Sequence, residues 1–216
     1  MAKTFLWVWL LSAAGCVFAA PTSPGTSLVN GVAATVGKAL VTVQDAYFFR
    51  SLQRFREGAG ELFRPEDGDD LRRTVRKIIF EEMVQGEMKS LHFEDRATGS
   101  EVANALRRDG RLREKQWKAL LSHFGKSENA ALEIVDRSLT VDKFMARKIE
   151  TLTPIVTQAD VDRYIKQNET RFRGSSPDSL KPNIILLLKK ERTQKGLEEW
   201  LRFLRDKYGV TNYLDG

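Results

Sequence analysis

Few side chains in this 216-residue sequence have the types and spacing that catalysis or metal binding requires. His92 and His123 are the only histidines, each stands beside a phenylalanine, and neither has a Cys or His partner at ligand spacing. Asp67, Asp69 and Asp70 form an acidic group, but the twelve-position ligand pattern of a calcium loop with its closing Glu is missing. We therefore predict no metal site, and we expect Asp70 to cap the helix that follows it.

The sequence also lacks the short motifs that would hold a nucleophile or a cofactor. It contains no serine nucleophile elbow, no Walker loop and no dinucleotide-binding glycine fingerprint. The one Gly-x-Gly, Gly58-Ala59-Gly60, follows a predicted helix, whereas a phosphate cradle precedes one. Cys16 is the only cysteine, so neither a disulfide framework nor thiol catalysis is expected. We predict no catalytic residue, no cofactor-binding residue and a protein that is not an enzyme.

The N-terminus has the layout of a secretory signal peptide. Lys3 supplies a positive charge, Phe5 to Leu11 is an unbroken apolar run, and Val17-Phe18-Ala19 places small residues at the positions that precede a cut. The apolar stretch from Thr4 to Ala20 is shorter than the ~20 residues that a membrane span needs. We expect residues 1–19 to be a signal peptide cleaved after Ala19, residues 20–27 to be a flexible leader, and the protein to be periplasmic.

An alternative processing route is open at the same place. Ala13-Ala14-Gly15-Cys16 resembles a bacterial lipobox, with a weak residue where Leu is usual. In that case Cys16 is the lipidation site and the first residue of the mature protein. We favour ordinary cleavage, and we expect membrane association only if Cys16 is lipidated.

The composition predicts a folded protein with a mixed charged surface. Apolar residues make up 42% of the chain, which suffices for a core, and the net charge is +6 with both signs interspersed along most of its length. No Lys/Arg motif interleaved with aromatic residues occurs, so we do not expect nucleic acid as a partner.

The chain beyond the leader reads as a hairpin followed by helices. Two β-like runs, Leu28 to Val36 and Ala39 to Val41, flank a turn at Gly37-Lys38 and lead into a capping box at Thr42 to Asp45. Further helices are predicted from Asp70 to Met88, after a capping box at Thr98 and Glu101, across Trp117 to Phe124, from Ser127 to Pro154, after a capping box at Thr157 and Asp160, and from Leu180 to Tyr208, with a strand at Val210 to Leu214. The helix from Ser127 has a predicted buried stripe of Leu132, Val135, Leu139, Met145, Ile149 and Leu152. We expect one mainly α-helical domain over residues 28–216, with a small β element formed by the hairpin and the last strand.

This order resembles the N-terminal chaperone module of the SurA family of periplasmic peptidyl-prolyl isomerases, which is akin to the substrate-binding domain of trigger factor. The resemblance is carried by Val32-Ala33-Ala34-Thr35-Val36-Gly37 with Val41 to Asp45, by Pro154 to Val161 with Tyr164, and by the tail from Trp200-Leu201 to Tyr213. In that family a parvulin isomerase of about a hundred residues sits between the last two helices. Here only residues 171–179 occupy that place, so the resemblance implies a chaperone without the isomerase.

The resemblance implies an ATP-independent periplasmic chaperone or assembly factor for unfolded envelope and outer-membrane proteins. The alternatives are a peptidyl-prolyl isomerase, or a dedicated subunit of one envelope complex, with or without a lipid anchor. Met and aromatic side chains suit promiscuous binding, because Met repacks easily and aromatic rings bury large areas. Each such residue is more simply a core residue, but together they could line a groove for clients. The candidate client-binding residues are Phe48, Phe63, Met83, Met88, Trp117, Phe124 and Phe144.

Overall fold

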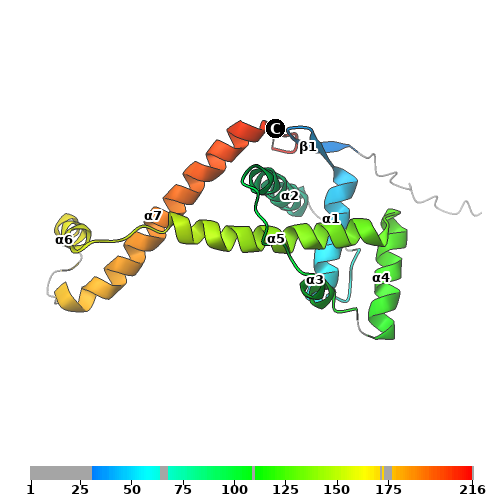
Figure 1. The fold of residues 1–216 in the computed structure, drawn as a ribbon, viewed down its shortest axis with the longest axis horizontal. Helices are drawn as coiled ribbons and strands as arrows, with labels where there is room; N and C mark the ends of the chain where they lie inside the picture. The colour runs from blue at the N-terminus through cyan, green and yellow to red at the C-terminus, as the bar shows by residue number, and fades with distance from the viewer. Residues whose placement is uncertain (1–30, 64–67, 109, 171, 173–176, 216) are drawn as a thin grey trace, which may run out of the picture.

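A computed structural model describes residues 31–63, 68–108, 110–170, 172 and 177–215 of the chain. The predicted signal peptide, the leader and Cys16 lie outside the described residues. Within them the fold is mainly helical, with seven helices and one three-stranded antiparallel sheet (Figure 1). This confirms the predicted fold class, including the β element shared by the two ends of the fold.

The sheet joins the first and last elements of the described chain. Strands β1 (Val32–Val36) and β2 (Ala39–Thr42) form the hairpin, and β3 (Val210–Asn212) pairs with the other edge of β1. In the β1–β3 register Val36 faces Val210 and Ala34 faces Asn212. Gly37 makes the hairpin turn at a φ of +57°, a left-handed conformation that favours glycine. Along the C-terminal segment the half-buried and exposed side chains alternate as predicted, with Thr211 and Tyr213 on the exposed side.

Five helices build the body of the molecule around this sheet. They are α1 (Val43–Glu57), α2 (Gly68–Ser90), α3 (Gly99–Leu106), α4 (Arg111–Phe124) and α5 (Glu128–Leu152). One core cluster lies between the sheet, α1, α2, α5 and the end of the last helix, and a second lies between α1, α3, α4 and α5. Because α1 and α5 contribute to both clusters, the two cores form one continuous body.

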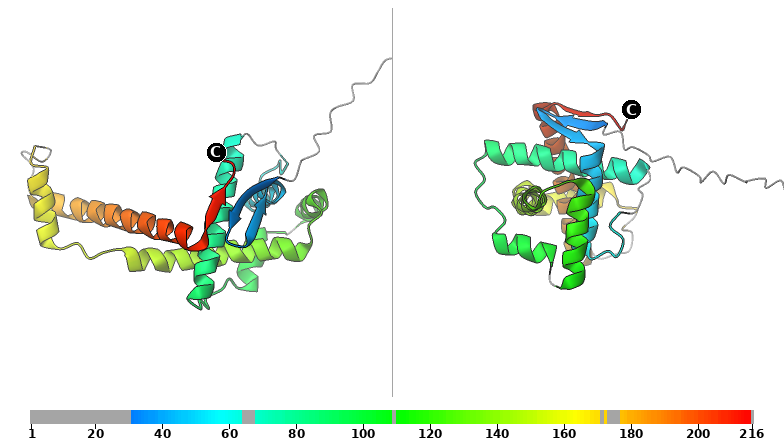
Figure 2. Two further views of the ribbon diagram at one scale, coloured as in Figure 1. Left: turned by 90° about the horizontal axis from the view of Figure 1, so that it is seen from above. Right: turned by 90° about the vertical axis from the view of Figure 1, so that its right-hand side faces the viewer.

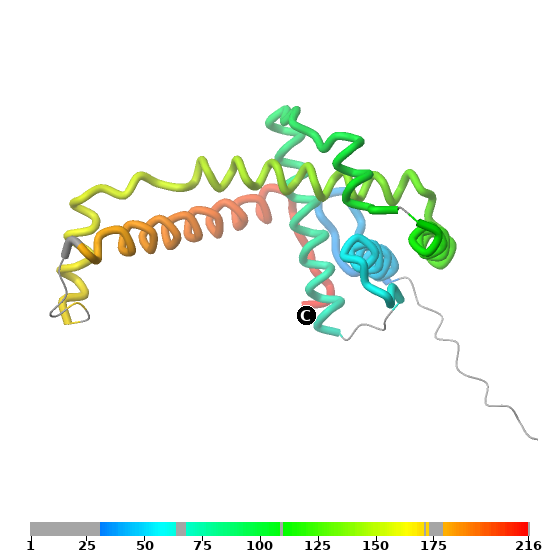
Figure 3. The backbone as a smooth tube through the Cα atoms, turned by 90° about the horizontal axis from the view of Figure 1, so that it is seen from below, coloured from blue at the N-terminus to red at the C-terminus, as the bar shows by residue number. Residues whose placement is uncertain are grey.

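The remaining helices form an arm that projects from the body (Figures 1 and 2). The arm comprises residues 153–196, that is, the connection after α5, helix α6 (Gln158–Gln167) and the N-terminal half of α7 (Pro177–Tyr208). It has its own small core, in which Val161 of α6 packs against Ile184 and Leu188 of α7. The tube in Figure 3 shows α7 running back from α6 to the body, where it leads into β3.

Three helices begin with the capping boxes that the sequence predicts. Thr42, Thr98 and Thr157 each accept a hydrogen bond from the backbone N–H three residues on, and the acidic side chain at that position accepts one in return from the threonine backbone. Ser127 likewise caps α5, its hydroxyl accepting from the backbone N–H of Ala130 at 3.2 Å. These contacts are local, which is why short sequence patterns suffice to locate them.

The C-terminal half of α7 is anchored on α2 by a close and polar contact. Lys207 Nζ donates to Glu87 Oε2 at 2.6 Å, and the Tyr208 hydroxyl donates to the same oxygen at 3.1 Å. Gly86 allows this approach, because a Cβ at that position would lie 2.7 Å from Cε1 of Tyr208. Trp200 adds a ring contact to Phe144 of α5, with centroids 6.2 Å apart.

Several predicted boundaries need correction. Helix α2 begins at Gly68, so Asp70 lies in its first turn and does not cap it. Helix α7 begins at Pro177, consistent with the preference of proline for a first helical turn, and β3 ends at Asn212. The predicted buried stripe of α5 does not extend to Ile149, which is 41% exposed because the end of α5 leaves the body. None of the described helices combines the length and apolar character needed to cross a bilayer.

Candidate functional site

The structure divides the seven predicted client-binding residues between the two cores of the body. Met83, Met88 and Phe144 lie in the cluster beneath the sheet, and Phe48 and Trp117 lie in the cluster around α4. All five are buried. Phe124 is half-buried against Phe48, with ring centroids 5.4 Å apart, and Phe63 is 41% exposed beside Phe124 and His123. The seven residues therefore do not line one shared groove among the described residues; Met88 lines one surface hollow and Phe48 another.

The clearest cleft lies between the C-terminal end of α2 and the middle of α5. Its volume is about 460 Å³, within the range of small-ligand and side-chain pockets. Apolar surface comes from Met88 and the half-buried Phe93, and charged groups of both signs surround it. The lining residues are Gln85, Met88, Lys89, His92, Phe93, Glu94, Arg96, Asp136, Arg137 and Thr140. This mixture of apolar and polar groups can hold an apolar side chain together with the polar backbone on either side of it.

One wall of the cleft is the segment 91–98, which connects α2 to α3 and is fastened to α5. The backbone N–H of Ala97 donates to Thr140 Oγ1 at 2.9 Å, and Lys143 Nζ donates to the carbonyl of Arg96 at 3.1 Å. Arg147 forms an ion pair with Asp95 at 2.6 Å. These contacts fix an irregular segment against a helix, so the cleft is a formed feature of the body.

Glu101 strengthens this attachment from the start of α3. The Thr98 backbone N–H and the Lys143 ammonium donate hydrogen bonds to its carboxylate, at 2.6 and 2.9 Å. Together they lower the pKa of Glu101 to about 2, with the Thr98 backbone bond as the largest cause. The carboxylate is therefore charged at neutral pH, where it accepts both hydrogen bonds.

An aromatic stack connects the cleft to the base of the arm. The ring of Phe93 meets Phe144 edge to face with centroids 5.1 Å apart, and Phe144 in turn contacts Trp200 of α7. Lys148 places its ammonium 5.0 Å from the centre of the Trp200 ring. Phe93 and Trp200 are both half-buried, and the ring of Phe144 between them is buried, so the stack joins the cleft to α7 mainly through the core. Phe93 was not among the predicted binding residues, because the segment around it shows no helical or strand periodicity.

Beneath the cleft a buried polar group links α2 to α5. Glu81 is 2% exposed and accepts hydrogen bonds from the Ser138 hydroxyl at 2.9 and 3.0 Å. Arg137 Nε lies 3.6 Å from Glu81 Oε2, and the Arg137 guanidinium also pairs with Glu82. Burial raises the pKa of Glu81, and the Ser138 hydrogen bond and the charge of Arg137 oppose that effect only in part. This arrangement positions Arg137 at the cleft wall.

The histidines take structural positions on separate elements. His92 is exposed at the cleft, in the turn after α2, and the ring of His123 packs against Phe63 with centroids 4.3 Å apart. Among the described residues, no group of three His, Cys, Asp or Glu side chains is placed to hold a metal ion.

In comparisons with known proteins, no family model, no curated protein and no solved structure matches this chain.

Proposed function

We propose that this chain is an ATP-independent periplasmic chaperone or assembly factor that binds unfolded envelope proteins and has no isomerase activity. The observation that carries the proposal is the cleft between α2 and α5, with Met88 and Phe93 on its walls and charged residues on its rim. Burial of a client's apolar side chain there would drive binding, and the polar rim would meet the client backbone. A site of this size and mixed lining favours weak, reversible and unspecific binding.

The cleft and the arm together support a protein-binding role. The half-buried rings of Phe93 at the cleft and of Trp200 at the base of the arm both contact the buried ring of Phe144. An extended client segment seated in the cleft could therefore also contact the exposed part of Trp200. The order of hairpin, capped helices and returning strand is also the order that the resemblance to the SurA family implies.

The first experiment measures how many clients the protein accepts. Purified protein is added to several unrelated chemically unfolded proteins, including outer-membrane β-barrels, and light scattering follows their aggregation. Suppression for several clients without ATP is the expected result. Suppression for none would contradict general chaperone activity and favour the dedicated subunit of one complex.

A second experiment tests the cleft itself. Gln85→Trp and Lys89→Trp place bulky rings at the half-buried and exposed rim, and we expect each to weaken client binding several-fold. Lys118→Trp on α4 is the matched control, because Lys118 is also an exposed helical lysine but lies outside the cleft. Melting temperatures verify that all three variants fold. Equal client binding by the rim variants and the wild type would show that clients bind elsewhere.

The isomerase alternative is tested separately. The connection between α6 and α7 spans residues 168–176, far too short for a parvulin module of about a hundred residues. We therefore expect no acceleration of prolyl isomerisation in a protease-coupled peptide assay. Acceleration above background that is lost on a point substitution in this chain would overturn that part of the proposal.

A further inference from the structure

In the sequence, the net positive charge of the chain is concentrated in the stretch 153–196, which contains α6 and the first part of α7. Residues 153–196 form about a fifth of the sequence, yet they contain nine Lys or Arg against five Asp or Glu, a net +4 of the total +6. Residues 31–152 contain 22 basic and 20 acidic residues, so the much larger part of the body is close to neutral. Such an asymmetry points to a partner of opposite charge.

Within the arm, α7 has two different faces. Ile184 and Leu188 are buried against α6, whereas Leu186, on the opposite face, is 69% exposed. Lys189 and Lys190 follow Leu186 at three and four residues, so they share its face of the helix, and both are exposed. No acidic residue occurs between positions 182 and 190. This outer face of α7 is therefore basic with an apolar residue at its centre.

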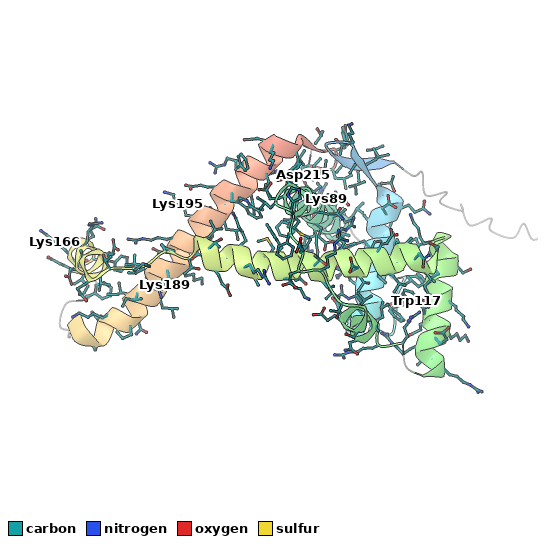
Figure 4. All side chains as sticks on the ribbon, in the orientation of Figure 1. Lys89, Trp117, Lys166, Lys189, Lys195 and Asp215 are labelled. Carbon is teal, nitrogen blue, oxygen red and sulfur yellow. The ribbon has the colours of Figure 1, made fainter. Side chains whose placement is uncertain are left out.

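The acidic groups of the arm do not neutralise these lysines. Asp160 is engaged by Arg192 at 2.8 Å and by Arg163 at 3.6 Å. Lys166 of α6, Lys189 and Lys190 form no ion pair with any carboxylate in the part of the chain that the structure describes. Figure 4 shows Lys166 and Lys189 on the arm, away from the body.

The geometry points to an anionic lipid bilayer as the partner of the arm, with the outer face of α7 lying against the lipid headgroups. The lysines supply the attraction to lipid phosphates, and Leu186 can enter the interface between headgroups and acyl chains. Ile155, which is 88% exposed in the connection before α6, adds a second apolar side chain to the arm. This contact needs no lipid on Cys16, and it is independent of client binding in the cleft.

A bilayer fits these observations better than an acidic protein or a nucleic acid. The large aromatic side chains of the arm, Tyr164 and Phe172, are half-buried and pack against each other with ring centroids 6.1 Å apart. They therefore offer no exposed platform on which bases could stack. An exposed leucine between lysines, without exposed aromatic rings, matches the amphipathic interface of a membrane-surface helix.

The expected binding strength follows from the number of free lysines. A basic side chain close to an anionic lipid surface contributes about fivefold to partitioning, the equivalent of about 1 kcal/mol. Removal of the charges at positions 189 and 190, the two lysines on the outer face of α7, should thus weaken vesicle binding by roughly 25-fold. Added salt should weaken the binding of the unaltered protein as well, because the Debye length falls from about 10 Å at 0.1 M to about 3 Å at 1 M.

The experiment is co-sedimentation with vesicles that contain phosphatidylglycerol and phosphatidylcholine, or phosphatidylcholine alone. The protein begins at residue 20, so that the predicted signal peptide, residues 1–19, is not present; all the packing described above lies within residues 31–215. The test variant carries Lys189→Gln and Lys190→Gln. The control carries Lys38→Gln and Lys115→Gln, which remove the same charge from exposed positions of the body. Melting temperatures and circular dichroism establish that both variants fold.

The inference is supported if the protein binds anionic but not neutral vesicles, and if the arm variant loses this binding while the body variant keeps most of it. Leu186→Ser should weaken binding further, by several-fold. Three outcomes overturn it: no binding to anionic vesicles at low salt, equal losses in the two variants, or displacement from vesicles by an equal concentration of an acidic polypeptide. The last outcome would assign the arm to acidic proteins.

Discussion

The contact between Gly86 of α2 and the ring of Tyr208 makes a sharp prediction about stability. Gly86 lies inside a helix, where alanine is normally favoured over glycine by about 1 kcal/mol. An alanine Cβ would however approach Cε1 of Tyr208 to 2.7 Å and Cζ to 2.9 Å, which is closer than real side-chain contacts allow. Gly86→Ala must therefore displace the ring, or strain it in place.

Either response has a known order of magnitude. Overpacking typically costs about 1 to 3 kcal/mol, and loss of the Tyr208 hydrogen bond to the buried Glu87 carboxylate costs about 1.5 to 3 kcal/mol. After the helix-propensity gain of about 1 kcal/mol, we expect Gly86→Ala to change the free energy of unfolding by about 0 to −2 kcal/mol. The gain in helix propensity alone would have raised the free energy of unfolding.

Gly196→Ala in α7 is the matched control. A Cβ there would meet Cδ2 of Leu152 at 3.6 Å, an ordinary van der Waals distance. This variant should therefore gain about 1 kcal/mol, so the two substitutions should differ by about 1 to 3 kcal/mol. For a chain of this size that corresponds to about 3 to 9 °C in melting temperature. Thermal and urea unfolding followed by circular dichroism measure both values.

A double substitution identifies the cause. In a Tyr208→Ala background the ring is absent, so Gly86→Ala should become stabilising by about 1 kcal/mol. If Gly86→Ala and Gly196→Ala stabilise the otherwise unaltered protein equally, α7 does not rest on α2 as described. The anchoring of the arm would then be wrong as well.

Three further predictions address other parts of the chain. Ser138→Ala should lower the free energy of unfolding by about 1 to 3 kcal/mol in urea titrations at pH 7, since it leaves the buried Glu81 carboxylate without its hydroxyl donor. Burial raises the pKa of Glu81 in the folded protein above its value in the unfolded chain. The contribution of Glu81 to the free energy of unfolding is therefore most favourable at pH values below the unfolded-state pKa, and it is lost as the pH rises through the folded-state pKa. The gain in melting temperature from Glu81→Gln should accordingly be larger at pH 8 than at pH 4. Deletion of residues 209–216 should cost roughly 2 to 4 kcal/mol, because the backbone bonds of three register pairs with β1 are lost, and a melting temperature unchanged within a degree or two would contradict this. Intact mass should show a mature chain that begins at Ala20; a retained Met1 would exclude cleavage, and a diacylglyceryl group on Cys16 would establish the lipoprotein alternative.

Local sequence patterns predicted the helix starts well, because each depends on a few neighbouring residues. The threonines at positions 42, 98 and 157 cap helices through the acidic residue three positions later, and the structure confirms all three boxes. The predicted start of α2 lies too late in the sequence, because Gly68 has no side chain that could cap a helix whereas Asp70 has one. Capping preference identifies a suitable residue, but it does not tell whether the helix has already begun.

The candidate site was less predictable, because large apolar side chains serve both cores and binding surfaces. Trp117 and Phe48 are the types that line grooves, yet here they are 2% and 1% exposed, between helices distant in sequence. Conversely, Phe93 lines the cleft from an irregular segment in which no periodicity marks it as important. Which side of a helix faces solvent depends on neighbours distant in sequence, such as Ser138 and Glu81, which are 57 residues apart.

The charge distribution of the chain could likewise not be interpreted from the sequence alone. Along the sequence, basic and acidic residues alternate closely enough that no basic block stands out. The net +4 of residues 153–196 becomes meaningful only when the fold shows that α6 and the first part of α7 leave the body together (Figures 1 and 2). Within the arm, Arg192 and Arg163 engage Asp160. Lys189 and Lys190 on α7 pair with no carboxylate of the described residues.

The topology explains how one short chain could hold a client cleft and a separate membrane contact. The arm is inserted between α5 and the end of α7, and both of those segments are packed into the body, through Phe144 with Trp200 and through Glu87 with Tyr208. Strand β3 then pairs with β1, so the arm is held at both of its ends and cannot swing on a single linker. Its orientation relative to the cleft is therefore set by those contacts. Because Phe144 also touches Phe93 at the cleft wall, a change that loosens α7 should alter client binding and the position of the arm together.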